Sequence, residues 1–139
     1  MKRINAPLYA ALALSVSTTA LYAEPKTNML HQWAQGSEAA AIAKLGETFE
    51  AEGGTWNQTA MSGHTSATLA KLRSDVVAGN APAAVQLKGP EIAEWTTTGR
   101  TANLDDLAKS EGWDDVVAPE LLSVMKPAGN WVAAPMNIH

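Results

Sequence analysis

Residues 30–54 read LHQWAQGSEAAAIAKLGETFEAEGG and combine the end of a strand-like segment, a polar turn and a long helical pattern. Residues 29–33 predict a short strand, because two apolar residues lead into a more polar edge. In the turn, Ser37 is a suitable N-cap, and the negative charge of Glu38 favours a helix N-terminus. The segment therefore predicts a strand followed directly by a helix.

The predicted helix is amphipathic. Ile42, Leu45 and Phe49 are spaced i, i+3 and i+7, which places them on one helical face. Glutamates lie among them and form the solvated part of the helix, and Gly53-Gly54 ends it.

The strand–helix pattern then occurs twice more. Residues 55–61 and residues 83–87 predict strands, and the second is mostly apolar, as a strand buried on both faces should be. Pro90 lies at the start of the helix that follows residues 83–87, at the position where proline fits best. Helical spacing follows the two strands at Leu69, Leu72 and Val76 and at Ile92 and Trp95. This order predicts right-handed crossovers and an α/β fold with a mainly parallel sheet flanked by helices.

The signal for regular structure weakens after Gly99. A short helix is predicted around residues 104–107, with two aspartates in its first turn, and another within residues 114–125. Residues 125–132 predict a hairpin with a Pro/Gly/Asn turn. Residues 133–138 predict a strand still in progress where the sequence stops, so we expect a truncated domain.

Residues 1–23 have the parts of a secretory signal peptide. Lys2 and Arg3 precede an apolar run that ends in small residues at Ala23, the preferred cleavage point. The run is shorter than the roughly 20 residues that a membrane span needs, which argues against an uncleaved anchor. We therefore expect an exported, periplasmic protein.

Composition narrows the class of partner. The chain has no cysteine, so disulfides cannot stabilise it, which suits a bacterial periplasmic protein. Its 14 acidic side chains outnumber its 10 lysines and arginines, and the basic residues form no cluster. This balance argues against nucleic acid or an anionic membrane as a partner. The length suits one domain.

The sequence lacks the common signatures of catalysis and cofactor binding. The three histidines have no metal-ligand spacing. Ser62-Gly63-His64 lacks the pattern of a nucleophile elbow, and Lys88-Gly89 lacks that of a phosphate loop. We expect no metal, no cofactor and no enzymatic activity.

Several side chains are expected instead at the carboxyl ends of the strands, where open α/β sheets bind ligands. They are Trp33, Glu38, Gln86, Lys88, Asn137 and His139. An aromatic ring can cover the C–H face of a sugar, and polar groups can bind its hydroxyls. Each residue also has a structural interpretation: Trp33 as a core or edge residue, and Lys88 as a solvated lysine. Trp95 and Trp131 are interpreted as packing residues, and His64 as a loop residue.

The chain resembles the extracellular solute-binding proteins of ABC-type sugar importers, and within them the glucose/mannose-binding branch. The resemblance rests on LHQWAQGSEAAAIAKLGETFEAEGGTW, AGNAPAAVQLKGPEIAEW, ANLDDLAKSEGWDDV and APMNIH. It implies two α/β lobes with sugar in the cleft between them, and delivery of that sugar to a membrane permease. Residues 24–139 would be a truncated N-terminal lobe, with the second lobe missing. We expect a monomer.

The resemblance also implies roles for individual residues. Trp33 matches the second of two adjacent aromatic residues that stack on the sugar, and Gln32 stands in the place of the first. The other matching positions are Glu38, Gln86, Lys88, Asn137 and His139. Two alternatives stay open: a secreted α/β hydrolase whose catalytic residues lie beyond this sequence, and a non-functional remnant.

Overall fold

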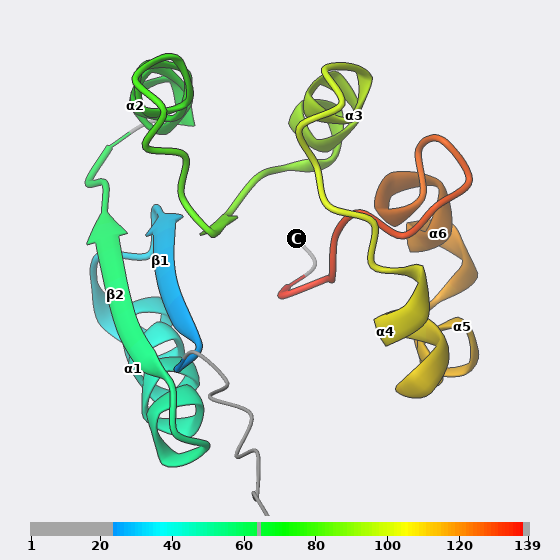
Figure 1. The fold of residues 1–139 in the computed structure, drawn as a ribbon, viewed down its shortest axis with the longest axis horizontal. Coiled ribbons are helices and arrows are strands. Elements are labelled where there is room, and N and C mark those ends of the chain that lie inside the picture. The colour runs from blue at the N-terminus through cyan, green and yellow to red at the C-terminus, as the bar shows by residue number, and fades with distance from the viewer. Residues whose placement is uncertain (1–23, 64, 138–139) are drawn as a thin grey trace, which may run out of the picture.

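A computed structural model describes residues 24–63 and 65–137 of the protein. Within these residues, three strand–helix units come first and three short helices follow (Figure 1). The elements are β1 (Lys26–His31), α1 (Gly36–Ala51), β2 (Thr55–Ala60), α2 (Thr65–Val77), β3 (Ala84–Val85), α3 (Gly89–Thr97), α4 (Asp105–Ser110), α5 (Trp113–Val116) and α6 (Pro119–Met125). The predicted signal peptide, His64, Ile138 and His139 lie outside the described residues.

The strands form a parallel sheet in the order β2-β1-β3. β1 pairs with β2 along its whole length, from Lys26 opposite Thr55 to His31 opposite Ala60. On its other side, β1 pairs with β3 at Met29 and Leu30. The parallel α/β fold predicted from the element order is therefore confirmed. From β1 the chain goes to β2 on one side, and it then crosses to β3 on the other side of β1. The boundary between β1 and β3 is therefore the topological switch point.

Two details of the predicted strands are wrong. β1 begins at Lys26 and ends at His31, so Trp33 belongs to the turn that follows it. β3 contains only Ala84 and Val85, and Ala84 is exposed, so this strand is not buried on both faces. β3 lies at an edge of the described sheet and pairs there with β1 alone.

Helix α1 packs on the sheet through a narrower face than its apolar spacing predicts. Ile42 is 1% exposed and Gly46 is buried, whereas Leu45 is 44% exposed, so its prediction as a buried residue is wrong. A Cβ atom at Gly46 would lie 2.8 Å from Cδ1 of Trp56, so glycine allows the helix to approach β2 closely.

The start of α1 also differs from the expectation. The N-cap is Gln35 rather than Ser37, and no side-chain hydrogen bond caps the helix. Gly36, with φ of +63°, makes the turn into the helix in a left-handed conformation that glycine adopts at little steric cost. The chain therefore enters the helix before Ser37.

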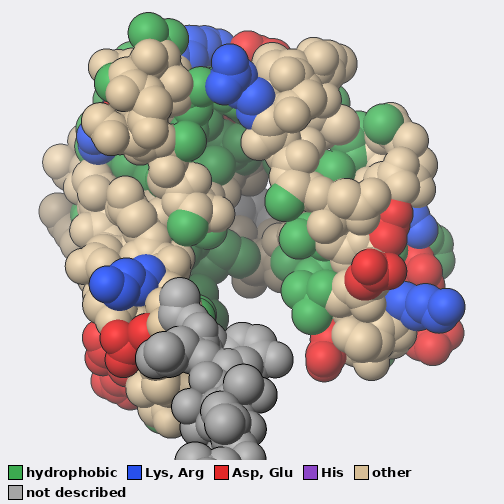
Figure 2. All heavy atoms as spheres, viewed as in Figure 1, with side chains coloured by type: hydrophobic (Ala, Val, Ile, Leu, Met, Phe, Trp, Pro, Cys, Tyr) green, Lys and Arg blue, Asp and Glu red, His purple; other side chains and the backbone are tan. Residues whose placement is uncertain are grey.

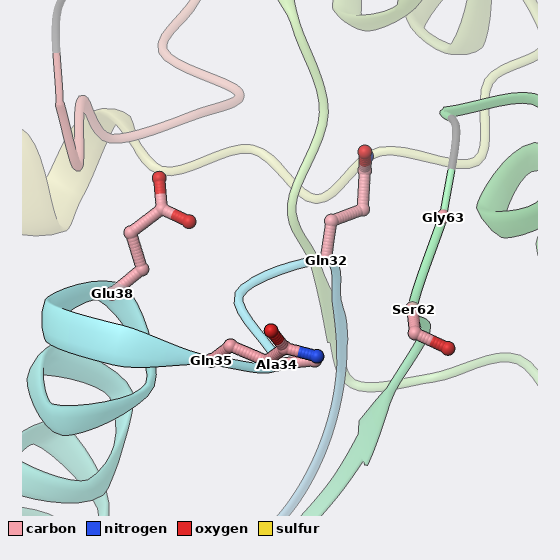
Figure 3. Close-up of a pocket in the computed structure, with 6 residues that line it drawn as sticks. All are labelled: Gln32, Ala34, Gln35, Glu38, Ser62 and Gly63. Carbon is pink, nitrogen blue, oxygen red and sulfur yellow. The ribbon is translucent and has the colours of Figure 1, made fainter.

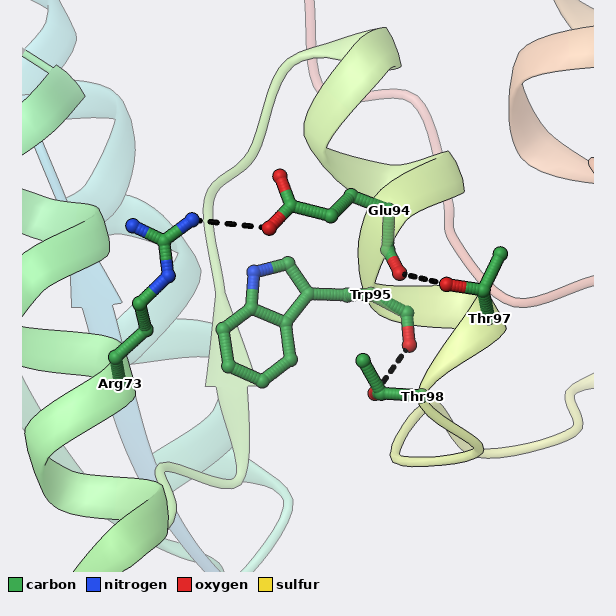
Figure 4. Close-up of polar contacts among 5 residues, drawn as sticks. All are labelled: Arg73, Glu94, Trp95, Thr97 and Thr98. Carbon is green, nitrogen blue, oxygen red and sulfur yellow. Dashed lines mark hydrogen bonds and ion pairs between the residues drawn. The ribbon is translucent and has the colours of Figure 1, made fainter.

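An apolar cluster joins the sheet to helices α2 and α3. Its buried members are Leu30, Leu72 and Trp95. Figure 4 shows the Trp95 ring projecting from α3 toward α2, beside the ion pair between Arg73 and Glu94, 2.9 Å apart. Because the pair is exposed, we attribute the joining of these helices mainly to the apolar contacts. The interpretation of Trp95 as a packing residue is confirmed.

A second apolar cluster joins α3 to the last third of the chain. Ile92, Ala108, Met125 and Trp131 are its buried members, and Trp131 is 2% exposed. Trp113 packs edge-on against Trp131, with ring centroids 5.4 Å apart. Trp131 is therefore a packing residue, as expected. Helix α3 contributes to both clusters and links the two sides of the molecule.

No hairpin or strand forms in the described part of residues 125–138, where both were predicted. A turn takes the place of the hairpin, and the backbone N–H of Val132 donates to the carbonyl of Met125 across 3.0 Å. Asp105 fixes this turn from α4 by accepting hydrogen bonds from Asn130 Nδ2 and from the Trp131 backbone N–H. Residues 133–137 pair with none of the described strands and are irregular.

The other predicted helices are present. Asp105 and Asp106 lie in the first turn of α4 as expected, and residues 113–125 form two short helices instead of one. Figure 2 shows a hollow between the side formed by the sheet and the side formed by α4–α6, with hydrophobic side chains along its walls. In residues 24–63 and 65–137, no helix has the length and apolar character to cross a membrane.

Candidate functional site

The carboxyl ends of β1 and β3 are held together by two hydrogen bonds. The backbone N–H of Gln86 donates to the carbonyl of Leu30, and the backbone N–H of Gln32 donates to Oε1 of Gln86, each across 2.9 Å. The second bond joins the first residue after β1 to the first residue after β3. It lies at the switch point, where the chain order makes a crevice available to ligands.

A polar pocket of about 260 Å³ opens beside this tie (Figure 3). Its walls come from the turn after β1, the first turn of α1 and the residues after β2. The lining residues are Gln32, Ala34, Gln35, Glu38, Ser62 and Gly63. In Figure 3, the side chains of Gln32 and Glu38 project toward the same side of the ribbon, from the residue after β1 and from α1 respectively. An amide and a carboxylate therefore face one open volume.

The Gln32 carboxamide is anchored from α2. Oγ1 of Thr65, the first residue of α2, donates to Oε1 of Gln32 across 3.2 Å. Gln32 is half-buried, so its side chain reaches the pocket without lying free in solvent.

The predicted residues near the switch point do not share one environment. Glu38 is exposed and lines the pocket, and Trp33 is half-buried in the same turn but does not line it. Gln86 is half-buried, and its Oε1 is used by the backbone of Gln32. Lys88 is exposed at the start of α3, where its backbone N–H donates to the Glu91 carboxylate across 3.0 Å.

Asn137 lies in a different place from this group. It lines a second pocket of about 580 Å³, formed by α5, α6 and the C-terminal segment. The other lining residues are Val116, Val117, Ala118, Leu121, Pro135 and Met136. The structure therefore does not bring Asn137 into the polar pocket, and His139 lies outside the described residues.

Sequence reasoning did not place Gln32, Gln35 or Ser62 among the ligand-binding residues, although all three line the polar pocket. Gln32 was considered only as a replacement for an aromatic residue. A signal was available, because Gln32 and Ser62 follow the ends of parallel strands closely.

His31 is buried and contacts a side chain of β2. It is 2% exposed, and its Nε2 lies 3.1 Å from Oε1 of Gln58. Among the described residues, no group of three His, Cys, Asp or Glu side chains could hold a metal ion.

Proteins similar in sequence are named as probable sugar-binding periplasmic proteins. The chain is 40% identical over 131 residues to one from Rhizobium meliloti (strain 1021), covering 94% of this chain and 32% of the relative. One from Brucella suis biovar 1 (strain 1330) is 40% identical over 120 residues, covering 84% and 28%. The chain thus spans about a third of the length of these relatives. No protein-family model matches it.

Solved structures confirm the fold. A galacto-N-biose/lacto-N-biose I-binding protein of an ABC transporter from Bifidobacterium longum matches with a TM-score of 0.62 and 20% identity, over 78% of this chain and 27% of that one. An ABC transporter-associated binding protein from B. animalis subsp. lactis Bl-04 matches with a TM-score of 0.64 and 15% identity, over 78% and 25%. The chain therefore has part of the α/β fold of ABC-transporter binding proteins. These relatives and neighbours are described as binding proteins, not as enzymes.

Proposed function

We propose that this protein is a periplasmic sugar-binding receptor that delivers a monosaccharide of the glucose/mannose type to the membrane permease of an ABC transporter. The observation that carries the proposal is the polar pocket at the carboxyl ends of β1 and β2, the edge at which open α/β sheets bind ligands, next to the switch point between β1 and β3. The identity of 40% to a probable sugar-binding periplasmic protein supports the same class of ligand.

The chemistry of the pocket suits a neutral polyol. The Glu38 carboxylate accepts hydrogen bonds, and the amides of Gln32 and Gln35 supply donors and acceptors. None of the described residues that line the pocket is a lysine or arginine, which an anionic ligand such as phosphate would favour. Trp33, beside the pocket in the same turn, supplies a ring for the apolar face of the sugar.

The proposed receptor has a wider set of contacts than this pocket. Trp33, Glu38, Gln86, Lys88, Asn137 and His139 are its proposed ligand-binding residues. Residues 1–23 direct export, and residues 24–139 belong to the N-terminal lobe of a monomeric two-lobe protein. The relatives are about three times as long as this chain, which leaves room for a second lobe.

Calorimetric titration of the full-length protein, as its host cell makes it, tests the proposal. D-glucose, D-mannose and a disaccharide would be titrated separately, and each sugar would be recovered afterwards and analysed. We expect micromolar binding of a monosaccharide and recovery of unchanged sugar. Tighter binding of the disaccharide would contradict the monosaccharide assignment, and hydrolysis would favour a secreted α/β hydrolase. Absence of binding to any sugar would refute the receptor.

A further inference from the structure

Gln32 has a backbone that is fixed by two neighbouring strands. It directly follows β1, and its N–H group is bound by Oε1 of Gln86 across 2.9 Å. The Gln32 Cα is therefore tied to the ends of both β1 and β3. A side chain attached at this point has a defined origin, which is a requirement for a selective contact.

The oxygen and the NH2 group of the Gln32 carboxamide differ in their hydrogen bonding. A carboxamide has one oxygen that accepts and one NH2 group that donates. The oxygen is engaged by Thr65 Oγ1 at 3.2 Å. Within the described part of the chain, no protein acceptor receives a hydrogen bond from the NH2 group, and the side chain lines the 260 Å³ pocket. Thr65 thus selects one orientation of the amide and leaves its donors available.

Glu38 lies on another wall of the same pocket and has the opposite hydrogen-bonding character. Its carboxylate accepts hydrogen bonds, and it projects to the same side as Gln32 (Figure 3). A sugar hydroxyl both accepts and donates, so one hydroxyl or two adjacent ones can bind to both residues. The pocket therefore pairs a fixed donor with an acceptor.

We infer that Gln32 is a specificity-determining ligand contact whose NH2 group donates to one particular sugar hydroxyl, with Thr65 as the residue that positions it. This inference rests on the proposed sugar-binding function and refines it. It assigns part of the selectivity to a hydrogen bond, in addition to the stacking proposed for Trp33. A bond of this kind discriminates between sugars that differ at one ring position, because loss of the hydroxyl leaves a half-buried donor unpaired.

The experiment combines variants of the full-length protein with D-glucose and the set of its monodeoxy derivatives. In the wild type, one derivative should bind roughly fivefold more weakly than D-glucose through loss of the Gln32 contact. Gln32→Met removes both polar atoms and keeps a similar length. Gln32→Met should bind D-glucose roughly fivefold more weakly than the wild type does. It should bind that derivative and D-glucose with similar affinities, because the contact is already lost.

The controls separate this contact from a structural effect. Gln58→Met removes an exposed amide that bonds His31 and lines neither pocket, so it should keep the wild-type discrimination. Gln32→Leu also removes both polar atoms and should lose the same discrimination, which provides a second variant if Gln32→Met does not fold. Thr65→Val should reduce the discrimination at the same ring position, because the amide is then free to turn.

The outcomes distinguish the inference from the proposed function. If the wild type binds no sugar, both are wrong. If it binds D-glucose and Gln32→Met weakens all derivatives by one common factor, Gln32 has only a structural role and the inference fails alone. Unchanged affinities in Gln32→Met would also overturn it, and an unchanged profile in Thr65→Val would remove the positioning role of Thr65.

Discussion

The backbone N–H of Gln32 donates a hydrogen bond to Oε1 of Gln86 across 2.9 Å, which joins the ends of β1 and β3 through a side chain. Gln86 was predicted from the sequence as a ligand-binding residue. Its oxygen already accepts one hydrogen bond within the protein, so a sugar would share that oxygen or bind to the NH2 group. Gln86, predicted as a ligand residue, therefore makes this hydrogen bond within the protein itself.

Gln86→Leu should lower the free energy of unfolding by about 1–3 kcal/mol, because the Gln32 N–H loses its acceptor in a partly buried place. Urea unfolding followed by circular dichroism measures the change. Gln86→Glu keeps an acceptor oxygen and is the matched control, with stability close to that of the wild type. Equal loss in both variants would show that the hydrogen bond is not the cause.

Trp33→Ala should weaken sugar binding by about 2 kcal/mol, or roughly thirtyfold in Kd, as the loss of a central aromatic contact often does. Calorimetry on the full-length protein measures it, and Trp33→Tyr should recover part of the affinity because it restores a ring. Unchanged affinity in Trp33→Ala would return this half-buried residue to a structural role.

Glu38→Gln should weaken sugar binding by about 1–2 kcal/mol, because a charged acceptor makes a stronger hydrogen bond than a neutral one. Glu47→Gln is the control on the same helix, where the carboxylate pairs with Lys44 at 3.0 Å and lines neither pocket. Equal affinities of the two variants in the same titration would exclude Glu38 from the site.

Asp105 should make folding stability depend on acid pH. The side-chain hydrogen bond from Asn130, followed by that from the Trp131 backbone, lowers the pKa of Asp105 in the folded protein. Because the folded pKa is the lower one, the stabilisation is present above the pKa of an unfolded aspartate, about 3.9, and is lost as pH falls through the folded value. Melting temperatures measured from neutral to acid pH should show this loss.

Asp105→Asn should remove that part of the pH dependence and lower the melting temperature at neutral pH. Asp106→Asn is the matched control, since Asp106 is the exposed neighbour in the same helical turn. Identical pH profiles for Asp105→Asn and the wild type would contradict the role given to these hydrogen bonds.

Gly46→Ala should destabilise the protein by about 1–3 kcal/mol, because the added Cβ would lie 2.8 Å from Cδ1 of Trp56. Alanine has the higher helix propensity, so a destabilising result identifies the steric contact as the larger effect. Thermal unfolding measures the change, and the double variant with Trp56→Leu should be less affected by the alanine. A stabilising effect of the single substitution would refute the contact.

Periodicity made the order of elements predictable, because it reports which side of a segment is apolar. Ile42, Ile92 and Trp95 are buried as their spacing indicated. The same spacing could not show that Leu45 is 44% exposed, because what packs against a helix is not a local property of the sequence. Residues 133–137 have strand-like composition, but a strand also needs a partner, and they pair with none of the described strands.

The place of the candidate site was more predictable from the sequence than the side chains that form it. The rule that ligands bind at the carboxyl ends of parallel strands led to the turn that contains Trp33 and Glu38. The roles of Gln32 and Thr65 depend on a contact between the turn after β1 and α2 that no spacing along the chain encodes.

The contact between Gly46 and Trp56 constrains the order in which this part of the sequence can change over evolutionary time. A larger side chain at position 46 should cost less stability once the indole at position 56 has been replaced by a smaller group. Substitutions at the two positions therefore form an ordered pair, and recombination that separates α1 from β2 would join incompatible partners. Chimeras of related proteins are best built with both elements from the same parent.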